Sequence, residues 1–217
     1  MPREQRGTYG VNEGAPAKRP RNAANTRGVI LAAAKTLLAE QGFARWGVNA
    51  IARASGYDKQ LIYRYFGGMD GLAEAIAEDV SAWMESALVR PENVPPPASY
   101  AEMMARVAVA LLDALRSDPL AQKILAWELS APSTLATAFT EARGKALSAW
   151  IARERGTLQR PTGIDAPVLN ALLIASIQQL VLSGAASGRF LGLDLAGEAG
   201  WERVRGGIAG LTKAMYQ

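Results

Sequence analysis

The stretch that decides the fold is residues 47–66, GVNAIARASGYDKQLIYRYF. Apolar residues recur at helical spacing in both of its halves, so each half has one apolar face. The halves meet at Ser55-Gly56, where glycine can adopt the left-handed conformation that a tight turn needs. Asp58 stands where the second helix begins, and its carboxylate can accept hydrogen bonds from free N–H groups of the first turn. The pattern predicts a helix-turn-helix.

A longer amphipathic helix is expected before this pair. It begins at Asn25 or Thr26, continues to about Gln41, and ends at Gly42. Its apolar face should combine with the two short helices into one small core, made from Ile30, Leu37, Phe43, Val48, Ile51, Ile62 and Phe66. In this prediction Phe43 inserts between the first helix and the pair. Residues 25–68 are therefore predicted to form a three-helix DNA-binding domain, with the first helix as its brace.

Charge is distributed unevenly along the chain. Residues 1–69 carry 11 Lys/Arg against 4 Asp/Glu, a net +7, whereas residues 70–217 carry 13 against 16, a net −3. A basic N-terminal third indicates that this part faces a polyanion, although chance asymmetry on a solvated surface gives the same numbers. Residues 1–24 are predicted to be a disordered basic tail. Its cluster of Lys18, Arg19 and Arg21 could lie along DNA or only keep the chain in solution.

The composition excludes several classes of function. The chain has no cysteine and no histidine, which removes disulfides, the usual zinc ligands and imidazole acid–base chemistry. We therefore expect no catalytic site, metal site or cofactor. The first 20 residues contain no apolar segment of a secretory signal. The longest apolar segment, residues 166–184, is interrupted by Asn170, Gln178 and Gln179, and is interpreted as a buried helix rather than a membrane span. A cytoplasmic protein is expected.

The motifs over residues 26–76 carry a family resemblance. They are Thr26-Arg27, Ala33, Leu37, Glu40-Gln41-Gly42-Phe43, Val48-x-x-Ile51-Ala52-x-x-Ser55-Gly56, Ile62-Tyr63-x-Tyr65-Phe66 and Leu72. This stretch resembles the N-terminal domain of TetR-type transcriptional repressors. The resemblance implies an all-α homodimer whose N-terminal helix-turn-helix domains bind a palindromic DNA operator. It also implies that residues 69–217 form a helical domain that dimerises and binds a small-molecule effector, which releases the DNA.

Two positions depart from the family pattern. Gly47 stands where a Ser or Thr usually caps the second helix, and Met69 stands where a Lys usually contacts a phosphate. One charge-assisted phosphate contact per subunit is then expected to be missing. Arg45, Arg64 or the basic tail could replace it.

Candidate DNA contacts lie on the second helix of the pair and around it. Lys59 can reach guanine N7/O6 and Gln60 can pair with adenine; the alternative for each is a solvated surface residue. The resemblance adds Asn49, Tyr63 and Tyr65 at family positions that reach a base or a phosphate. Trp46 could lean on the sugar–phosphate backbone or only cover the edge of the domain.

The rest of the chain is predicted to be helical. A lever-like helix starts near Met69, a proline-rich segment interrupts it after residue 90, and further helices follow over 134–156, 166–187 and 198–215. The last two are expected to form the dimer interface. Large apolar residues and two polar ones are candidates for an effector pocket, with core packing as the alternative for each: Trp83, Met103, Met104, Trp127, Glu128, Phe139, Trp150 and Gln178.

The leading interpretation is a ligand-responsive repressor. An activator with the same DNA-binding domain is the first alternative. The second is an all-helical enzyme or small-molecule carrier, for which the sequence offers no catalytic constellation.

Overall fold

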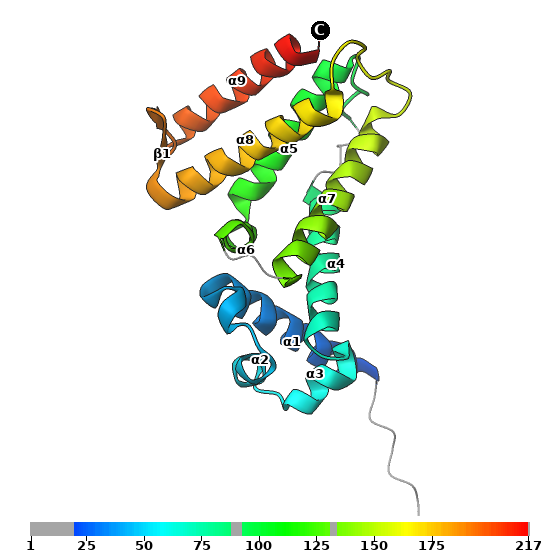
Figure 1. Ribbon diagram of the computed structural model, residues 1–217, viewed down its shortest axis with the longest axis vertical. Coiled ribbons are helices and arrows are strands. Elements are labelled where there is room, and N and C mark those ends of the chain that lie inside the picture. The colour runs from blue at the N-terminus through cyan, green and yellow to red at the C-terminus, as the bar shows by residue number, and fades with distance from the viewer. Residues whose placement is uncertain (1–19, 88–92, 131–133, 217) are drawn as a thin grey trace, which may run out of the picture.

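The computed structural model describes residues 20–87, 93–130 and 134–216, and these residues are almost entirely helical (Figure 1). The predicted all-α fold is confirmed. The elements are α1 (Pro20–Gln41), the 3-10 helix η1 (Phe43–Arg45), α2 (Val48–Ser55), α3 (Lys59–Phe66), α4 (Met69–Ala87), α5 (Tyr100–Ser117), α6 (Pro119–Ser130), α7 (Thr134–Arg155), α8 (Ala166–Ser187), the strands β1 (Arg189–Phe190) and β2 (Leu193–Asp194), and α9 (Glu198–Tyr216).

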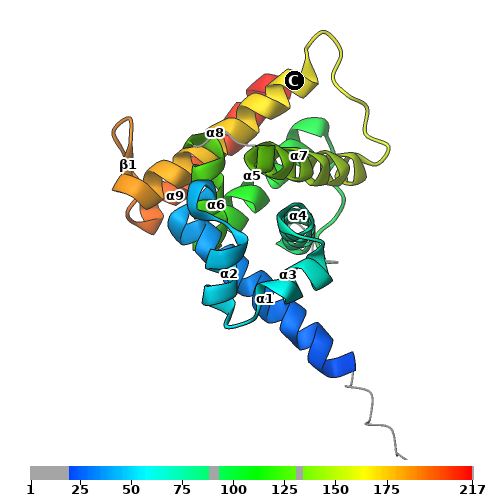
Figure 2. The same cartoon turned by 60° about the horizontal axis from the view of Figure 1, so that its bottom comes forward.

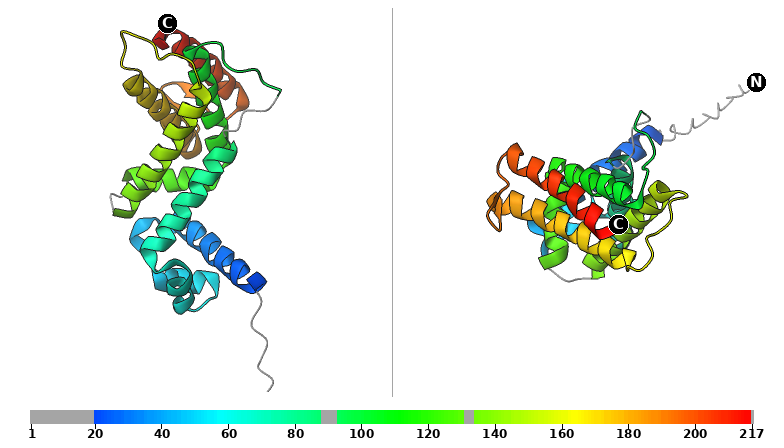
Figure 3. Two further views of the ribbon diagram at one scale, coloured as in Figure 1. Left: turned by 90° about the vertical axis from the view of Figure 1, so that its right-hand side faces the viewer. Right: turned by 90° about the horizontal axis from the view of Figure 1, so that it is seen from above.

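The helices form two groups joined by a long helix. α1, α2 and α3 lie together at one end of the molecule, and α4 runs from them toward the other end, packed along α7 (Figures 1 and 2). In the second group α5 is central, because both α8 and α9 pack against it. Seen from the side, α4 and α7 connect the two groups (Figure 3). The antiparallel hairpin β1–β2 joins α8 to α9.

The helix-turn-helix forms where the sequence predicts it. Gly56 has φ 72°, in the left-handed region, and ends α2. The carboxylate of Asp58 accepts a hydrogen bond of 2.7 Å from the backbone N–H of Gln60, which caps α3. The end of α2 at Gly56 and the start of α3 at Asp58 are therefore both determined by residues that the sequence identifies.

The start of the first helix was predicted wrongly. α1 begins at Pro20, before the expected cap at Asn25 or Thr26. Proline suits the first turn of a helix, since its missing N–H would have no partner there and its φ is already helical. Residues 20–24 therefore belong to α1. Lys18 and Arg19 lie outside the described residues.

The core of the N-terminal group extends beyond residues 25–68. Ile30, Ile51 and Ile62 are fully buried, as predicted. Phe43 is only half-buried, and its ring meets the edge of Phe139 from α7 at a centroid distance of 5.8 Å. The same apolar cluster includes residues of α4, α6 and α7. Phe43 therefore helps to join the two groups of helices instead of only filling the three-helix core.

A second contact between the groups involves Gly42 and Trp127. The Trp127 indole N–H donates to the backbone oxygen of Ala39 over 3.2 Å, and its ring covers Gly42, where a Cβ would lie 2.7 Å from the ring. Gly42 also has φ 69°, which L-residues rarely adopt. An ion pair between Lys35 and Asp79 links α1 to α4 nearby.

α8 differs from the buried helix that the sequence suggested. It is the one helix of the described ranges that is long and apolar enough to cross a membrane, with a mean hydropathy of 1.6 in its most apolar window, of which 22% is buried. One face packs on the core through Leu173 and Ile177, whereas Val168 and Leu172 are exposed. α8 meets the criterion for a membrane span by length and composition only.

The contact at Gly42 gives a stability prediction. Gly42→Ala should lower the free energy of unfolding by about 2–4 kcal/mol, because the methyl group adds left-handed strain and a clash with Trp127. The control is Gly28→Ala in α1, where a Cβ meets nothing within 4 Å; it should raise stability by about 0.5–1 kcal/mol. Urea unfolding measures both, and equal stabilities of the two variants would contradict this role of Gly42.

Candidate nucleic-acid interface and effector cavity

α3 presents one polar face to solvent. Ile62 and Phe66 bury its opposite face, so Lys59, Gln60 and Arg64 are exposed. Tyr63 is 56% exposed and lies over Gly68. The Asp58 cap holds the first turn of α3 in place, and Lys59 and Gln60 project from that turn. The structure therefore brings the predicted base-reading residues together on one accessible surface.

An open depression separates α2 from α3. Asn49 and Lys59 both line it, together with Arg53. All three side chains are exposed. Arg53 was not among the predicted contacts, although its position four residues after Asn49 places both on the same face of α2. Helical periodicity could have identified it.

Two arginines lie over aromatic rings around α3. The guanidinium group of Arg64 is 5.9 Å from the ring centroid of Tyr65, which is half-buried. The guanidinium group of Arg27, from α1, is 4.9 Å from the ring of Phe66. Arg27 was not predicted as a contact, because its proximity to the end of α3 arises only in the folded domain. Arg45 is exposed in η1.

Gly47 and Met69, the two departures from the family pattern, have structural roles that involve no contact group for a phosphate. Gly47 caps α2 through its backbone alone, with its carbonyl oxygen accepting from Ala50 and Ile51 at 2.9 and 3.0 Å. Met69 begins α4 and is half-buried. Neither position offers a hydroxyl or an ammonium group to a phosphate.

Trp46 does not have the exposure that a DNA contact needs. Its side chain is 6% exposed and packs in the N-terminal core, and its indole N–H donates to the backbone oxygen of Ala34 over 2.8 Å. The predicted contact with the sugar–phosphate backbone is corrected accordingly. The indole is large enough to close the core between α1 and η1, and its one donor already has a partner.

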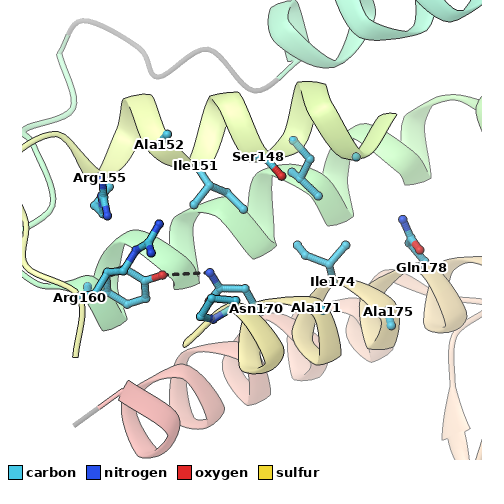
Figure 4. A pocket seen from close by; sticks show the side chains of 14 residues that line it. Ser148, Ile151, Ala152, Arg155, Arg160, Asn170, Ala171, Ile174, Ala175 and Gln178 are labelled. Atoms are coloured by element: carbon cyan, nitrogen blue, oxygen red, sulfur yellow. Dashed lines mark hydrogen bonds between the residues drawn. The ribbon is translucent and has the colours of Figure 1, made fainter. Parts of the chain in front are cut away.

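A cavity of about 410 Å³ lies between α7, α8 and the start of α5 (Figure 4). Its lining is mostly apolar and includes many small residues: Tyr100, Gly144, Leu147, Ser148, Ile151, Ala152, Arg155, Arg160, Pro167, Asn170, Ala171, Ile174, Ala175 and Gln178. Of the eight residues predicted to line an effector pocket, Gln178 lines this cavity and the other seven do not.

Those seven residues stabilise the fold instead. Met103, Met104, Phe139 and Trp150 are buried in the two apolar cores, and Trp83 is half-buried against one of them. Large side chains fill the space that they reach. The cavity forms where Gly144 and several alanines leave space open, whereas the large apolar residues named above lie in the cores.

Trp127 and Glu128 form contacts between elements. Trp127 covers Gly42, as described above. Glu128 accepts hydrogen bonds from Arg143 at 2.5 Å and from Thr140 at 3.2 Å, both on α7. Burial raises the pKa of the Glu128 carboxyl above its ordinary value, with Arg143 acting in the opposite direction. This pair fixes α6 against α7.

A small polar network connects the cavity to the last helix. Asn170 on α8 donates to the Tyr100 hydroxyl over 2.9 Å, and its side-chain oxygen accepts from the Tyr216 hydroxyl over 2.6 Å. The two tyrosine rings meet edge to face at 5.2 Å. Burial, with a smaller contribution from Tyr100, raises the pKa of Tyr216 to about 12. Three helices thus share hydrogen bonds beside the cavity.

The arrangement of the first three helices agrees with a known family. Residues 30–76 match the family described as "Bacterial regulatory proteins, tetR family". The chain carries a TetR-family DNA-binding domain. The match includes α2, α3 and the start of α4, and so covers most of the predicted DNA contacts.

Solved structures extend the TetR-type likeness over most of the chain. A protein from Rhodococcus sp. assigned to the TetR family of transcriptional regulators is 17% identical, with a TM-score of 0.60, covering 89% of this chain and all of its own. The regulator FadR from Bacillus subtilis, solved with stearoyl-CoA, is 18% identical with a TM-score of 0.58, and the match covers 86% of this chain and 97% of FadR. SmeT, solved with triclosan, is 20% identical with a TM-score of 0.57, and the match covers 84% of this chain and 91% of SmeT. At these identities the likeness shows a shared fold. No curated protein matches the sequence.

The Tyr216 network gives a prediction about pH. The folded-state pKa of about 12 exceeds the unfolded value of about 10, so the protonated hydroxyl contributes stability below pH 10 that is lost between pH 10 and 12. Urea midpoints should therefore fall more steeply above pH 10 in the wild type than in Tyr216→Phe. The variant should be less stable at pH 8 by about 1 kcal/mol, because it lacks the hydrogen bond to Asn170. Parallel curves for the two proteins would argue against this assignment.

Proposed function

We propose that this protein is a ligand-responsive transcriptional regulator that binds a palindromic operator as a homodimer, represses transcription, and is released by a small-molecule effector. The observation that carries the proposal is the exposed first turn of α3, with Lys59 and Gln60, on a domain that matches the TetR family. Exposed hydrogen-bonding side chains on the second helix of a helix-turn-helix are the groups that read base edges in the major groove.

The surrounding charges support DNA binding. Arg27, Arg45, Arg53 and Arg64 are exposed on α1, η1, α2 and α3. Such side chains bind phosphates and provide affinity that falls with salt, independently of base sequence. These four arginines could also replace the phosphate contacts that Gly47 and Met69 do not provide. We therefore assign phosphate binding to them.

The exposed apolar surface supports a homodimer through α8 and α9. Val168 and Leu172 are exposed on α8 and Leu211 on α9. A groove of about 400 Å³ runs between the two helices, lined by Leu180 and Ile208 among others. An apolar helix face of this kind is costly in water, and a second copy packing on it in two-fold symmetry would cover it.

The cavity between α7 and α8 supports response to a small molecule. Its volume falls in the range of about 300–1,000 Å³ found for ligand sites. Structures with the same fold contain stearoyl-CoA and triclosan. We place the effector in this cavity. α7 contacts the N-terminal group through Phe139 and lines the cavity at its other end through Arg155, so it offers a physical connection between effector and DNA.

The family match favours gene regulation over the enzyme or carrier considered above, and we propose that the protein works in the cytoplasm, where its DNA is. Repression is preferred to activation because it is the typical role of the family. A reporter strain with the gene deleted separates the two: expression of the target genes rises if the protein is a repressor and falls if it is an activator.

Base reading by α3 gives the next prediction. Lys59→Ala and Gln60→Ala should each weaken operator binding by about 1–3 kcal/mol and leave binding to unrelated DNA nearly unchanged, because they remove contacts to base edges. Genome-wide footprinting of the purified protein supplies the operator, and gel shifts with competitor DNA measure the two affinities. Lys123→Ala, an exposed lysine on α6, removes the same charge away from α3 and should bind as the wild type does. Equal losses on operator and competitor would assign Lys59 and Gln60 to phosphate contacts.

The dimer has a separate test. Leu172→Glu should convert the protein to a monomer at micromolar concentration, because each subunit loses the burial of a leucine, about 1.5–3 kcal/mol, and places a carboxylate in the interface. The control is Leu191→Glu in the turn between β1 and β2, where the leucine is 91% exposed against 60% for Leu172. Light scattering during gel filtration gives the mass of each variant. A dimeric Leu172→Glu would move the interface elsewhere.

A further inference from the structure

We propose that the cavity between α7 and α8 binds an amphipathic anion, a molecule with an apolar body and a carboxylate or phosphate group, and that Arg155 and Arg160 bind the anionic group. This inference rests on the proposed function for its biological meaning, since the ligand would be the effector.

The two arginines lie at the same end of the cavity. Figure 4 shows Arg155, from the end of α7, beside Arg160, from the following loop, with Gln178 at the opposite end. The lining contains no Asp or Glu. Two positive charges therefore face this end of the cavity with no carboxylate in the lining to balance them. Such a site attracts an anion and disfavours a cation.

Arg155 has a donor that needs a partner. Its Nε is buried and makes no hydrogen bond, and a buried unsatisfied donor on a charged group is costly. Within the described part of the C-terminal group, four arginines pair with carboxylates: Arg106 with Glu102, Arg116 with Glu198, Arg143 with Glu128, and Arg205 with three carboxylates. No such pair is formed by Arg155 or Arg160 in these ranges. A guanidinium group offers a planar fork of N–H donors that fits a carboxylate or a phosphate.

The remainder of the cavity requires an apolar body. Ile151 and Ile174 line it between the arginines and Gln178, with alanines around them, and Leu147 also belongs to the lining. Two polar side chains of the lining, Asn170 and Tyr100, are already hydrogen-bonded to each other. A small inorganic anion would leave this apolar surface facing water, whereas an acyl chain or an aromatic ring system attached to the anion would cover it.

The test measures binding to the full-length protein by calorimetry with three probes that share one chain: decanoate, decyl phosphate and 1-decanol. The wild type should bind at least one of the two anions about tenfold more tightly than the neutral alcohol, the effect of about one charge-assisted contact. The anion that binds more tightly, decanoate or decyl phosphate, shows whether the site prefers a carboxylate or a phosphate. Raising the salt concentration should reduce the preference for the anion.

Variants separate the charge from the cavity. Arg155→Gln and Arg160→Gln should each remove most of the preference for the anion while leaving the affinity for 1-decanol nearly unchanged. Arg153→Gln is the matched control, because Arg153 is exposed on the same helix and does not line the cavity. Gly144→Leu should weaken all three probes, since it fills space in the cavity and its Cβ meets nothing within 4 Å; circular dichroism confirms that the variant is folded.

Three results would overturn the proposal: equal affinity of the wild type for anion and alcohol, an anion preference that survives both Gln variants, or no binding of any probe. Gel shifts on the same preparations keep this inference distinct from the proposed function. Sequence-selective DNA binding without an anion preference refutes the ligand class alone. An anion preference without selective DNA binding supports the ligand class and refutes the regulator.

Discussion

The orientation of the recognition helix depends on one continuous apolar core that crosses the boundary between the two groups of helices. Ile62 and Phe66 of α3 belong to the same cluster as Leu72 and Ile76 of α4, Ile124 of α6 and Phe139 of α7. Close-packed protein interiors have low compressibility, and therefore they transmit a displacement of one element to its neighbours. α3 packs on α2 and α4, so it can change its position only together with α4 or by breaking its contacts to α4. The three-helix unit is not an independent module on a flexible linker.

α7 is the element that this core shares with the cavity. Its 22 residues span about 33 Å at 1.5 Å per residue. Phe139, near its start, contacts Phe43, and Arg143, one turn later, holds Glu128 of α6. Arg155, its last residue, lines the cavity. A ligand that binds Arg155 thus acts on a helix whose other end is fixed against the DNA-binding domain. Under the proposed function, this helix and α4 packed along it are the two rigid bodies that an effector has to move.

The sequence predicts the local structure well, because local chemistry determines it. Gly56 ends α2 and Asp58 caps α3, and both effects act over a few residues. The helices α7, α8 and α9 were also located closely, at 134–156, 166–187 and 198–215, because their apolar faces repeat at helical spacing. The start of α1 was missed because Pro20 was interpreted as part of a tail, although proline is favourable in a first turn.

The cavity could not be predicted in this way, since it is a property of tertiary packing. Bulky residues such as Trp150 suggested a pocket, but they fill the core, and open space depends on where glycine and alanine from different helices face one another. Gly144 of α7 and Ala171 of α8 are far apart in sequence and line the same cavity only in the folded chain. The same holds for Trp46 and Arg27. The role of each depends on contacts with distant elements, and no periodicity within one helix reveals them.

α8 combines two surfaces that the proposed function needs at once. The side with Asn170, Ile174 and Gln178 forms a wall of the cavity, whereas Val168 and Leu172 are exposed to solvent. Asn170 also fixes α8 to α5 and α9 through Tyr100 and Tyr216. A ligand that displaces α8 on the cavity side must therefore disturb this network or move α9 with it. If α8 and α9 form the dimer interface, ligand binding changes the relative position of the two subunits, and with it the separation of the two recognition helices, without any ligand contact to the DNA-binding domain.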